Sequence, residues 1–366
     1  MSKLSLPIAA VLALGLATSH LHGEPITVSR ATPIREITSS RFLQCAPRAD
    51  EGPLAAGIFF GDHIATAAEM RTAVRDYAQR YGAPPRVVKT FYSLADDFSA
   101  DGRAGQVLRA LREIPGVTPM VSLEPTWRGS PDTGLLELIT SGQADARLGR
   151  AAHDLAALGP APLLIELAAE MNATFGAPWQ AAANGKDTAP AAFVDAWRHV
   201  VGTMRRAGAH NVQWVFAPSA GNPHTHVHSG PSHWAWYGHW YPGDAYVDYL
   251  GLHAFNNALA QGAWVPFIEL VAGDAADRML DDMIERFPHR RIFLGEFATS
   301  EHPHHAAAKA RWIEDAYRRM QRCSAIAGVV WFDMDKEADW HIDSSRASAV
   351  AYHGAVRAAS AGPFGG

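Results

Sequence analysis

The chain is poor in cysteine and in charge. Only two of its 366 residues are cysteines, Cys45 and Cys323, so it can form one disulfide at most. Charged residues make up 19% of the sequence, and the formal net charge at pH 7 is only −5. Because there is no basic excess, we expect no nucleic-acid partner and no binding to anionic membrane surfaces.

Long apolar runs are also scarce, apart from one at the amino terminus. Lys3 is followed by an apolar run from Leu4 to Ala17 and then by the small or polar residues Thr18 and Ser19. The run is shorter than the ~20 residues that span a bilayer, and its order is typical of a secretory signal peptide. We therefore predict a signal peptide over residues 1–23 and a secreted or periplasmic protein without membrane contact after cleavage. A permanent membrane anchor is the alternative.

Short apolar segments recur after an irregular leader at residues 24–50, and amphipathic segments separate them. One of these, with Phe193, Trp197, Val200 and Met204 on one side, has the spacing of a helix with one apolar face. The alternation predicts repeated βα units. The expected strands are 55–60, 86–91, 118–123, 162–168, 212–217, 246–253, 291–295 and 327–332.

Eight alternating units over about 300 residues favour a closed parallel barrel. An open doubly wound sheet is the leading alternative, but no glycine-rich dinucleotide fingerprint follows the first segment. We therefore predict an α/β protein with a single (β/α)8 barrel, a TIM barrel, over residues 51–366. In such barrels the active-site groups lie at the carboxyl ends of the strands, which is where candidate residues were sought.

The two cysteines precede strands that become neighbours when the barrel closes. Cys45 comes before the first predicted strand and Cys323 before the eighth. Both thiols are therefore expected at the face formed by the amino ends of the strands. A disulfide between them is a hypothesis, and two buried free thiols are the alternative.

Two glutamates lie at the predicted carboxyl ends of strands four and seven, Glu170 and Glu296. Side chains at these ends can converge across the barrel axis. A carboxyl pair about 5–5.5 Å apart performs double displacement, in which one group attacks the anomeric carbon and the other protonates the leaving oxygen. We predict Glu170 as the acid/base and Glu296 as the charged nucleophile. Alone, each glutamate could instead be a helix N-terminal carboxylate stabilised by the helix dipole.

Several motifs resemble glycoside hydrolase family 26, which contains many β-mannanases and belongs to a clan with catalytic glutamates on strands four and seven. The resemblance spans about Gly57 to Asp343. The motifs are Glu170-Met171-Asn172 with Trp179, Tyr241-Pro242-Gly243-Asp244 with Tyr246-Val247-Asp248, Gly295-Glu296-Phe297, and Glu124-Pro125 with Trp127. The family commonly has a His where this chain has Ala169, and a Tyr that touches the nucleophile where it has Phe255.

The resemblance implies a retaining glycoside hydrolase that cleaves a β-linked polysaccharide, an endo-β-1,4-mannanase or a related β-glycanase. Because the two departures remove polar partners of the catalytic pair, other functions stay open. They are an exopolysaccharide-processing glycosidase of a distant branch, a catalytically inactive sugar-binding barrel, and a metal-dependent barrel hydrolase.

Aromatic platforms and polar side chains typically bind the apolar faces and the hydroxyl groups of sugars. The sequence has 11 tryptophans, several of them after predicted strands. The predicted substrate-binding residues are Asp62, His63, Glu124, Trp127, Asn172, Trp179, Trp234, Trp240, Tyr241, His253, Trp331 and Asp333. Each could instead stabilise a loop.

Histidines cluster in two loops and suggest a metal site. They are His224, His226, His228, His233 and His239 after strand five, and His302, His304 and His305 after strand seven. No acidic or cysteine cluster accompanies them. We therefore predict no metal and no cofactor. We also predict a monomeric protein whose partner is a polysaccharide or oligosaccharide substrate.

Overall fold

The computed structural model describes residues 40–47, 52–220, 232–257, 264–272 and 278–360. The predicted signal peptide and most of the predicted leader lie outside these residues, as do His224, His226 and His228. Within them, no helix is long and apolar enough to cross a membrane.

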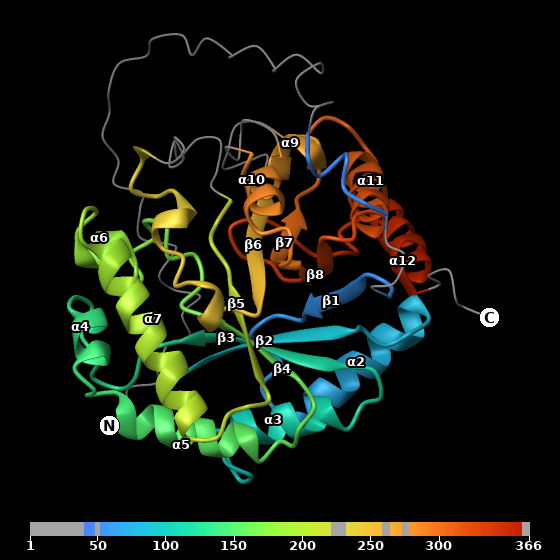
Figure 1. Ribbon diagram of the computed structural model, residues 1–366. Coiled ribbons are helices and arrows are strands. Elements are labelled where there is room, and N and C mark those ends of the chain that lie inside the picture. Colours follow the sequence, from blue (N-terminus) through green and yellow to red (C-terminus); the bar gives the residue numbers. More distant parts are fainter. Residues whose placement is uncertain (1–39, 48–51, 221–231, 258–263, 273–277, 361–366) are drawn as a thin grey trace, which may run out of the picture.

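Eight parallel strands form a closed barrel in sequence order, β1 to β8 (Figure 1). The barrel closes where β1 pairs with β8, with Gly57 opposite Val330. The strands are β1 (Ala55–Phe59), β2 (Val87–Ser93), β3 (Thr118–Glu124), β4 (Leu163–Leu167), β5 (Val212–Phe216), β6 (Tyr249–Asn256), β7 (Ile292–Thr299) and β8 (Ile326–Phe332). The predicted single (β/α)8 barrel is confirmed.

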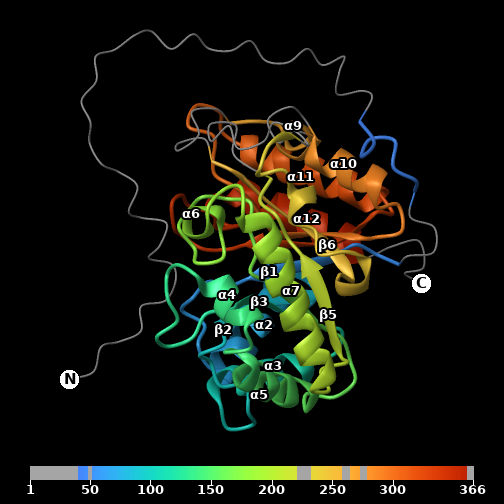
Figure 2. The ribbon, with the colours of Figure 1, turned by 60° about the vertical axis from the view of Figure 1, so that its left-hand side comes forward.

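Helices surround the barrel, and α7 packs against α4 and α5 on its outside (Figure 2). They are α2 (Ala67–Tyr81), α3 (Arg103–Arg112), α4 (Leu135–Thr140), α5 (Asp145–Ala156), α6 (Ala181–Asn184), α7 (Ala189–Arg206), α9 (Phe267–Ala272), α10 (Met279–Arg286), α11 (Ala308–Arg322) and α12 (Arg346–Ser360), with the 3-10 turns η3 (Tyr237–His239) and η4 (Asp244–Tyr246). Helix α7 buries the predicted apolar face, including Phe193 and Trp197. Helix α2 begins at a capping box formed by Thr66 and Glu69, and it ends at Gly82, whose φ of 87° is easiest for glycine.

The observed strand ends differ from the predicted ones, and the differences in β4, β6 and β7 bear on the site. Strand β7 continues past Gly295 to Thr299 and includes Glu296. All eight of its residues are buried. Strand β6 reaches Asn256 and includes both His253 and Phe255. Strand β4 ends at Leu167, so Glu170 lies in the following loop.

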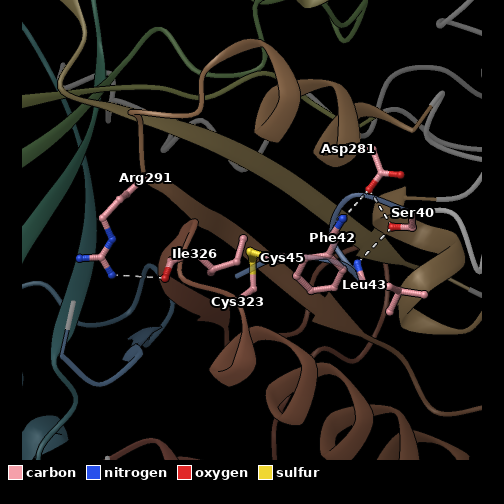
Figure 3. The surroundings of a disulfide bond; sticks show 8 residues. All are labelled: Ser40, Phe42, Leu43, Cys45, Asp281, Arg291, Cys323 and Ile326. Atoms are coloured by element: carbon pink, nitrogen blue, oxygen red, sulfur yellow. Dashed lines mark hydrogen bonds between the residues drawn. A yellow bond between two sulfur atoms is a disulfide. The ribbon is translucent and has the colours of Figure 1, made fainter. Parts of the chain in front are cut away.

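The segment before β1 is attached to the barrel by a disulfide between Cys45 and Cys323, as hypothesised (Figure 3). The bond joins this segment to the end of α11, next to the start of β8. Asp281 in α10 also accepts hydrogen bonds from the Ser40 hydroxyl group and the Phe42 backbone N–H (Figure 3). Residues 40–47 are therefore anchored to the barrel both covalently and by polar contacts.

Candidate active site

Three elements bring two carboxyl groups and one imidazole ring together. Glu170 follows β4, His253 lies in β6 and Glu296 lies in β7. Nδ1 of His253 is 3.5 Å from Oε1 of Glu170 and 3.7 Å from Oε1 of Glu296. These two oxygens therefore lie at most about 7 Å apart, which is compatible with the ~5–5.5 Å needed for double displacement.

Glu170 is held on a strained turn. Its φ is 57°, and that of Ala168 is 47°, in the left-handed region that residues other than glycine rarely adopt. Such conformations cost of the order of 1–3 kcal/mol each and persist only where surrounding contacts impose them. Here the Glu170 N–H donates to the Ala217 carbonyl, and the Gln180 side-chain amide donates to the Glu170 carbonyl. The backbone thus directs the Glu170 carboxyl group toward His253, and the Glu170 side chain is 21% exposed.

A buried ionic cluster lies next to this carboxyl pair. Lys89 in β2 and Glu166 in β4 are fully enclosed, and their side chains form a short ion pair. The Lys89 ammonium group also donates to Oε1 of Glu296 at 2.8 Å and to the Gly295 carbonyl at 3.2 Å. Nε2 of His253 lies 3.2 Å from Oε2 of Glu166. We call Lys89, Glu166, His253 and Glu296 the buried cluster.

Gly295 makes room for this cluster. A Cβ atom at this position would lie 1.8 Å from Oε1 of Glu166 and 3.2 Å from Nε2 of His253. No side chain can therefore be accommodated at Gly295 unless Glu166 moves. The glycine that precedes Glu296 is a steric requirement of the buried carboxylate.

Electrostatic interactions set the charges of the buried members. Burial raises the pKa of Glu166, but Lys89 and His253 outweigh that effect and lower it to about 2. Burial lowers the pKa of His253, but Glu296 and Glu166 outweigh it and raise the value to about 10. Burial also opposes the charge on Lys89, yet the same two glutamates raise its pKa. At neutral pH, Lys89 and His253 are cations and Glu166 is an anion.

Lys89 and Glu166 were not found from the sequence. Each interrupts an otherwise apolar strand, in the segments Val-Val-Lys-Thr-Phe and Leu-Leu-Ile-Glu-Leu. Charged residues are almost never fully buried unless they are paired, so a lysine and a glutamate inside two barrel strands are a signal for an internal ion pair. Both residues lie inside their strands, whereas the sequence argument concerns residues at the strand ends.

Several predicted sugar platforms are instead parts of the core. Trp240 and Trp331 are 0% exposed, and their indole N–H groups donate to the carbonyls of Trp234 and Trp340. Trp179 is 7% exposed and donates to the Ala169 carbonyl, next to Glu170. The prediction that Trp240 and Trp331 present a face to a sugar is wrong, because both side chains are fully buried, and Trp179 is too little exposed to offer a ring face.

Tyr241 does not lie at the mouth either. Its segment leads into the amino end of β6, where Arg290, just before β7, donates to the Asp244 carbonyl. The Tyr241 hydroxyl group donates to the Asp244 carboxylate, and its ring packs on Phe287. The predicted role in substrate binding is wrong because this motif shapes the face opposite the carboxyl ends of the strands.

Two polar candidates are occupied by internal contacts. Asn172 is fully buried, and its amide group exchanges two hydrogen bonds with the backbone of Ser219, so it joins the loops after β4 and β5. His253 is 2% exposed and belongs to the buried cluster, beneath the two carboxylates. The prediction that these two side chains contact a sugar hydroxyl directly is therefore wrong.

The remaining candidates do lie in loops or at strand ends around the mouth. Asp62 and His63 are exposed after β1, whereas Trp127 and Trp234 are half-buried and carry Arg147 and Lys186 over their rings. Asp333 is half-buried after β8 and accepts a hydrogen bond from the Ile342 N–H. Their roles in binding stay predictions.

Glu124, at the end of β3, has an unusual environment. It is 7% exposed, and its Oε2 atom has no hydrogen-bond partner among the described residues. Burial, reinforced by the nearby negative charges of Asp96 and Asp62, raises the pKa of Glu124 to about 7. A carboxyl group that is partly protonated at neutral pH can donate a hydrogen bond as well as accept one.

The buried cluster has a donor set that a metal could use, since Glu166, His253 and Glu296 offer atoms within 4.8 Å of one another. Lys89, however, already donates to both carboxylates, and its ammonium group occupies the place of a cation between them. The described histidines after β7 are in tilted or edge-on ring contact, with the His302 and His305 ring centroids 4.4 Å apart. No acidic residue completes a metal-binding group with them among the described residues.

The two departures from the family pattern have structural consequences. Ala169 has no polar side chain, and its carbonyl instead accepts the Trp179 N–H. The ring of Phe255 packs between Phe332 and Trp340, at centroid distances of 5.4 and 5.3 Å. Lys89 and His253 are the donors that face Glu296 here.

Comparisons with known proteins agree with this fold. No family profile matches the chain. The catalytic domain of a Bacillus sp. JAMB-750 GH26 endo-β-1,4-mannanase superposes with a TM-score of 0.60 at 16% identity, over 88% of this chain and 90% of that one. A GH26 β-mannanase from Bacteroides ovatus superposes with a TM-score of 0.55 at 13% identity, over 87% and 92%. The predicted resemblance to family 26 is confirmed at the level of the fold.

A curated relative is closer in sequence. Endoglucanase H of Acetivibrio thermocellus is 30% identical over 303 residues, which is 80% of this chain. The match covers only 30% of the length of that relative. The similarity therefore concerns one part of a much longer protein.

Gly295→Ala should destabilise the fold by about 1–3 kcal/mol or more, because the added methyl group displaces Glu166 from its ion pair. Denaturant unfolding measures the loss. Gly354→Ala in the exposed turn of α12 is the control, since its Cβ meets nothing within 4 Å and alanine favours a helix by up to about 1 kcal/mol. Equal stability of the two variants would contradict the steric argument.

Glu124 should make the protein less stable as the pH rises through neutrality. Folding raises the pKa of Glu124 from 4.5 to about 7. The stability that this group contributes is therefore complete below the unfolded-state pKa and is lost as the pH rises through the folded-state pKa. Glu124→Gln should exceed wild type in stability at pH 8 by on the order of 3 kcal/mol and approach it at pH 4. Unfolding curves at both values test this, with exposed Glu314→Gln as the control that should follow wild type.

Proposed function

Because the chain has the fold of the family 26 mannanases and is 30% identical over 303 residues to an endoglucanase, we propose that it is a glycoside hydrolase of that family. It cleaves a β-linked polysaccharide internally, as an endo-β-glycanase, with retention of configuration. The observation that carries the proposal is the approach of Glu170 and Glu296 to one nitrogen of His253.

Double displacement assigns one task to each carboxyl group. The Glu296 carboxylate attacks the anomeric carbon and forms a C–O bond while the bond to the leaving oxygen breaks. Glu170 gives its proton to that oxygen. Glu170 then removes a proton from a water molecule, whose oxygen forms a bond to the anomeric carbon as the bond to Glu296 breaks. Two inversions give retention, and both carboxyl groups return to their starting forms.

The environments of the two groups support this division. Glu296 is 8% exposed and faces the Lys89 ammonium group and the His253 ring, which favour a charged nucleophile. The Glu170 side chain is more exposed, at 21%. Its residue belongs to a strained turn, which places the carboxyl group next to His253 of the buried cluster. This is the arrangement expected when a nucleophile and an acid/base share one site.

The proposed substrate is a β-mannan or a β-glucan, since the relatives are named as mannanases and as an endoglucanase. Half-buried Trp127 and Trp234 supply aromatic faces, and exposed Asp62 and His63 supply polar groups. The predicted signal peptide supports action outside the cytoplasm, on a polymer that cannot enter the cell. The monomeric state and the absence of a cofactor stay predictions.

A polymer screen tests the substrate class. The enzyme is incubated separately with mannan, mixed-linkage glucan, xylan and the exopolysaccharide of the organism that produces it. The concentration of reducing ends and the viscosity are followed over time. Internal cleavage of a mannan or a glucan should lower the viscosity well before many reducing ends appear. Release of single sugars at constant viscosity would contradict internal cleavage, and cleavage of the exopolysaccharide alone would favour the distant branch.

Azide rescue tests the roles of the two glutamates. Glu170→Ala and Glu296→Ala should each lower activity by at least about 10²–10⁴-fold, which is the typical contribution of a general acid or base. With an activated aryl glycoside, azide should restore turnover in both, giving a β-azide from the Glu170 variant and an α-azide from the Glu296 variant. Product configuration is read by NMR.

Exposed Glu314→Ala is the matched control, and it should retain wild-type activity without azide. Full activity of either active-site variant would reject the mechanism. A wild-type protein that binds oligosaccharides but never cleaves them would instead support the inactive sugar-binding barrel.

A further inference from the structure

The buried cluster contains two charged residues that the double-displacement scheme does not use. Lys89 and Glu166 are 0% exposed at their side chains, so neither can touch a polysaccharide. Burying two ions is costly, and several kcal/mol per ion must be offset by good geometry. A pair placed against the candidate nucleophile therefore needs a functional explanation.

The Lys89 ammonium group is fixed in direction. It has three protons, and three acceptors surround it: a Glu166 oxygen, Oε1 of Glu296 at 2.8 Å and the Gly295 carbonyl at 3.2 Å. With every donor used, the ammonium group cannot rotate away from Glu296 without losing a hydrogen bond inside the protein. Oε1 of Glu296 is thereby held in one position.

Glu166 permits two cations to stand side by side. It contacts the Lys89 ammonium group and lies 3.2 Å from Nε2 of His253. Without its charge, the lysine and the histidine would repel each other in a dry interior. Glu166 itself cannot act on the substrate, because it lies below Glu296 and is completely enclosed.

We infer that Lys89 is a positioning residue that holds the Glu296 carboxylate oriented and charged for attack, and that Glu166 is the counter-ion that retains the ammonium group there. The inference rests on the proposed glycosidase function. The charged groups near Glu296 are Lys89 from β2, Glu166 from β4 and His253 from β6, and Glu170 from the loop after β4 approaches the same His253 nitrogen. Of these, Lys89 makes the shortest polar contact with it.

Sharing of the ammonium group explains why both residues are needed. An ammonium group bound to Glu296 alone would stabilise the free carboxylate strongly and so slow its attack on the anomeric carbon. Because Glu166 takes part of the interaction, the carboxylate stays charged but remains available. Removal of Lys89 and removal of Glu166 should therefore have opposite effects on the acidic side of the pH profile.

The test compares Lys89→Met, Glu166→Gln and the double variant of both. Two readouts are used: kcat/KM against pH on an activated aryl glycoside, and labelling of Glu296 by an activated fluorosugar that traps the glycosyl-enzyme. The acidic limb should move upward by about one to three pH units in Lys89→Met, so labelling below the limb falls at least about tenfold. In Glu166→Gln the limb should move downward.

The double variant protects the test against misfolding. Lys89→Met alone leaves Glu166 buried beside His253 only, whereas the double variant removes both charges with side chains of similar size. It should fold, and because the two removals act in opposite directions its limb should lie between those of Lys89→Met and Glu166→Gln. Lys309→Met is the matched control, because Lys309 is also 0% exposed but donates to the His341 carbonyl, away from Glu296. Its limb should stay at the wild-type pH.

Each outcome separates the two proposals. If wild type neither cleaves a polymer nor becomes labelled, the glycosidase function fails. If wild type is active and labelled but the limb of the double variant lies no higher than that of Glu166→Gln, the positioning role of Lys89 is overturned. It is likewise overturned if Lys309→Met moves the limb equally, since any buried lysine would then do the same.

Discussion

The ion pair between Lys89 and Glu166 is the constraint on which the rest of the site depends. Two ions sealed inside a barrel are costly unless close contacts and hydrogen bonds offset their lost hydration. The partners come from four strands, so the pair depends on the mutual positions of β2, β4, β6 and β7. Closure of the barrel supplies that rigidity, and Gly295 supplies the space. The position of Glu296 is therefore a consequence of core packing as much as of local sequence.

Glu170 is positioned in a different way. It lies beyond the end of β4, where two residues with positive φ turn the chain sharply. Trp179 and Gln180 hold the carbonyls of Ala169 and Glu170, which replaces the support that a strand would give. One carboxyl group is thus fixed by the interior of the barrel and the other by its rim. Two chemically identical side chains consequently meet different surroundings, as a division into nucleophile and acid/base requires.

The sequence predicted the barrel and the two glutamates because both depend on local patterns. Apolar runs give the eight strands, and a glutamate after such a run points to the mouth. The pattern failed where burial depends on distant partners. Trp240 and Trp331 looked like platforms because they follow or end strands, yet their N–H groups are bonded to carbonyls inside the core. Lys89 and Glu166 lie 77 positions apart, and nothing local shows that they meet.

The charges of the buried cluster also suit the two steps of the proposed reaction. Lys89 and His253 are cations, so with Glu166 and a charged Glu296 the cluster is neutral. A neutral Glu170 keeps the whole site neutral before the first step, which is the form that an acid must have. When Glu296 becomes an ester, the cluster gains one net positive charge beside Glu170. That charge lies beside the carboxylate that takes a proton from water in the second step. In the proposed reaction, the cluster thus balances the negative charge that Glu170 carries between the two steps.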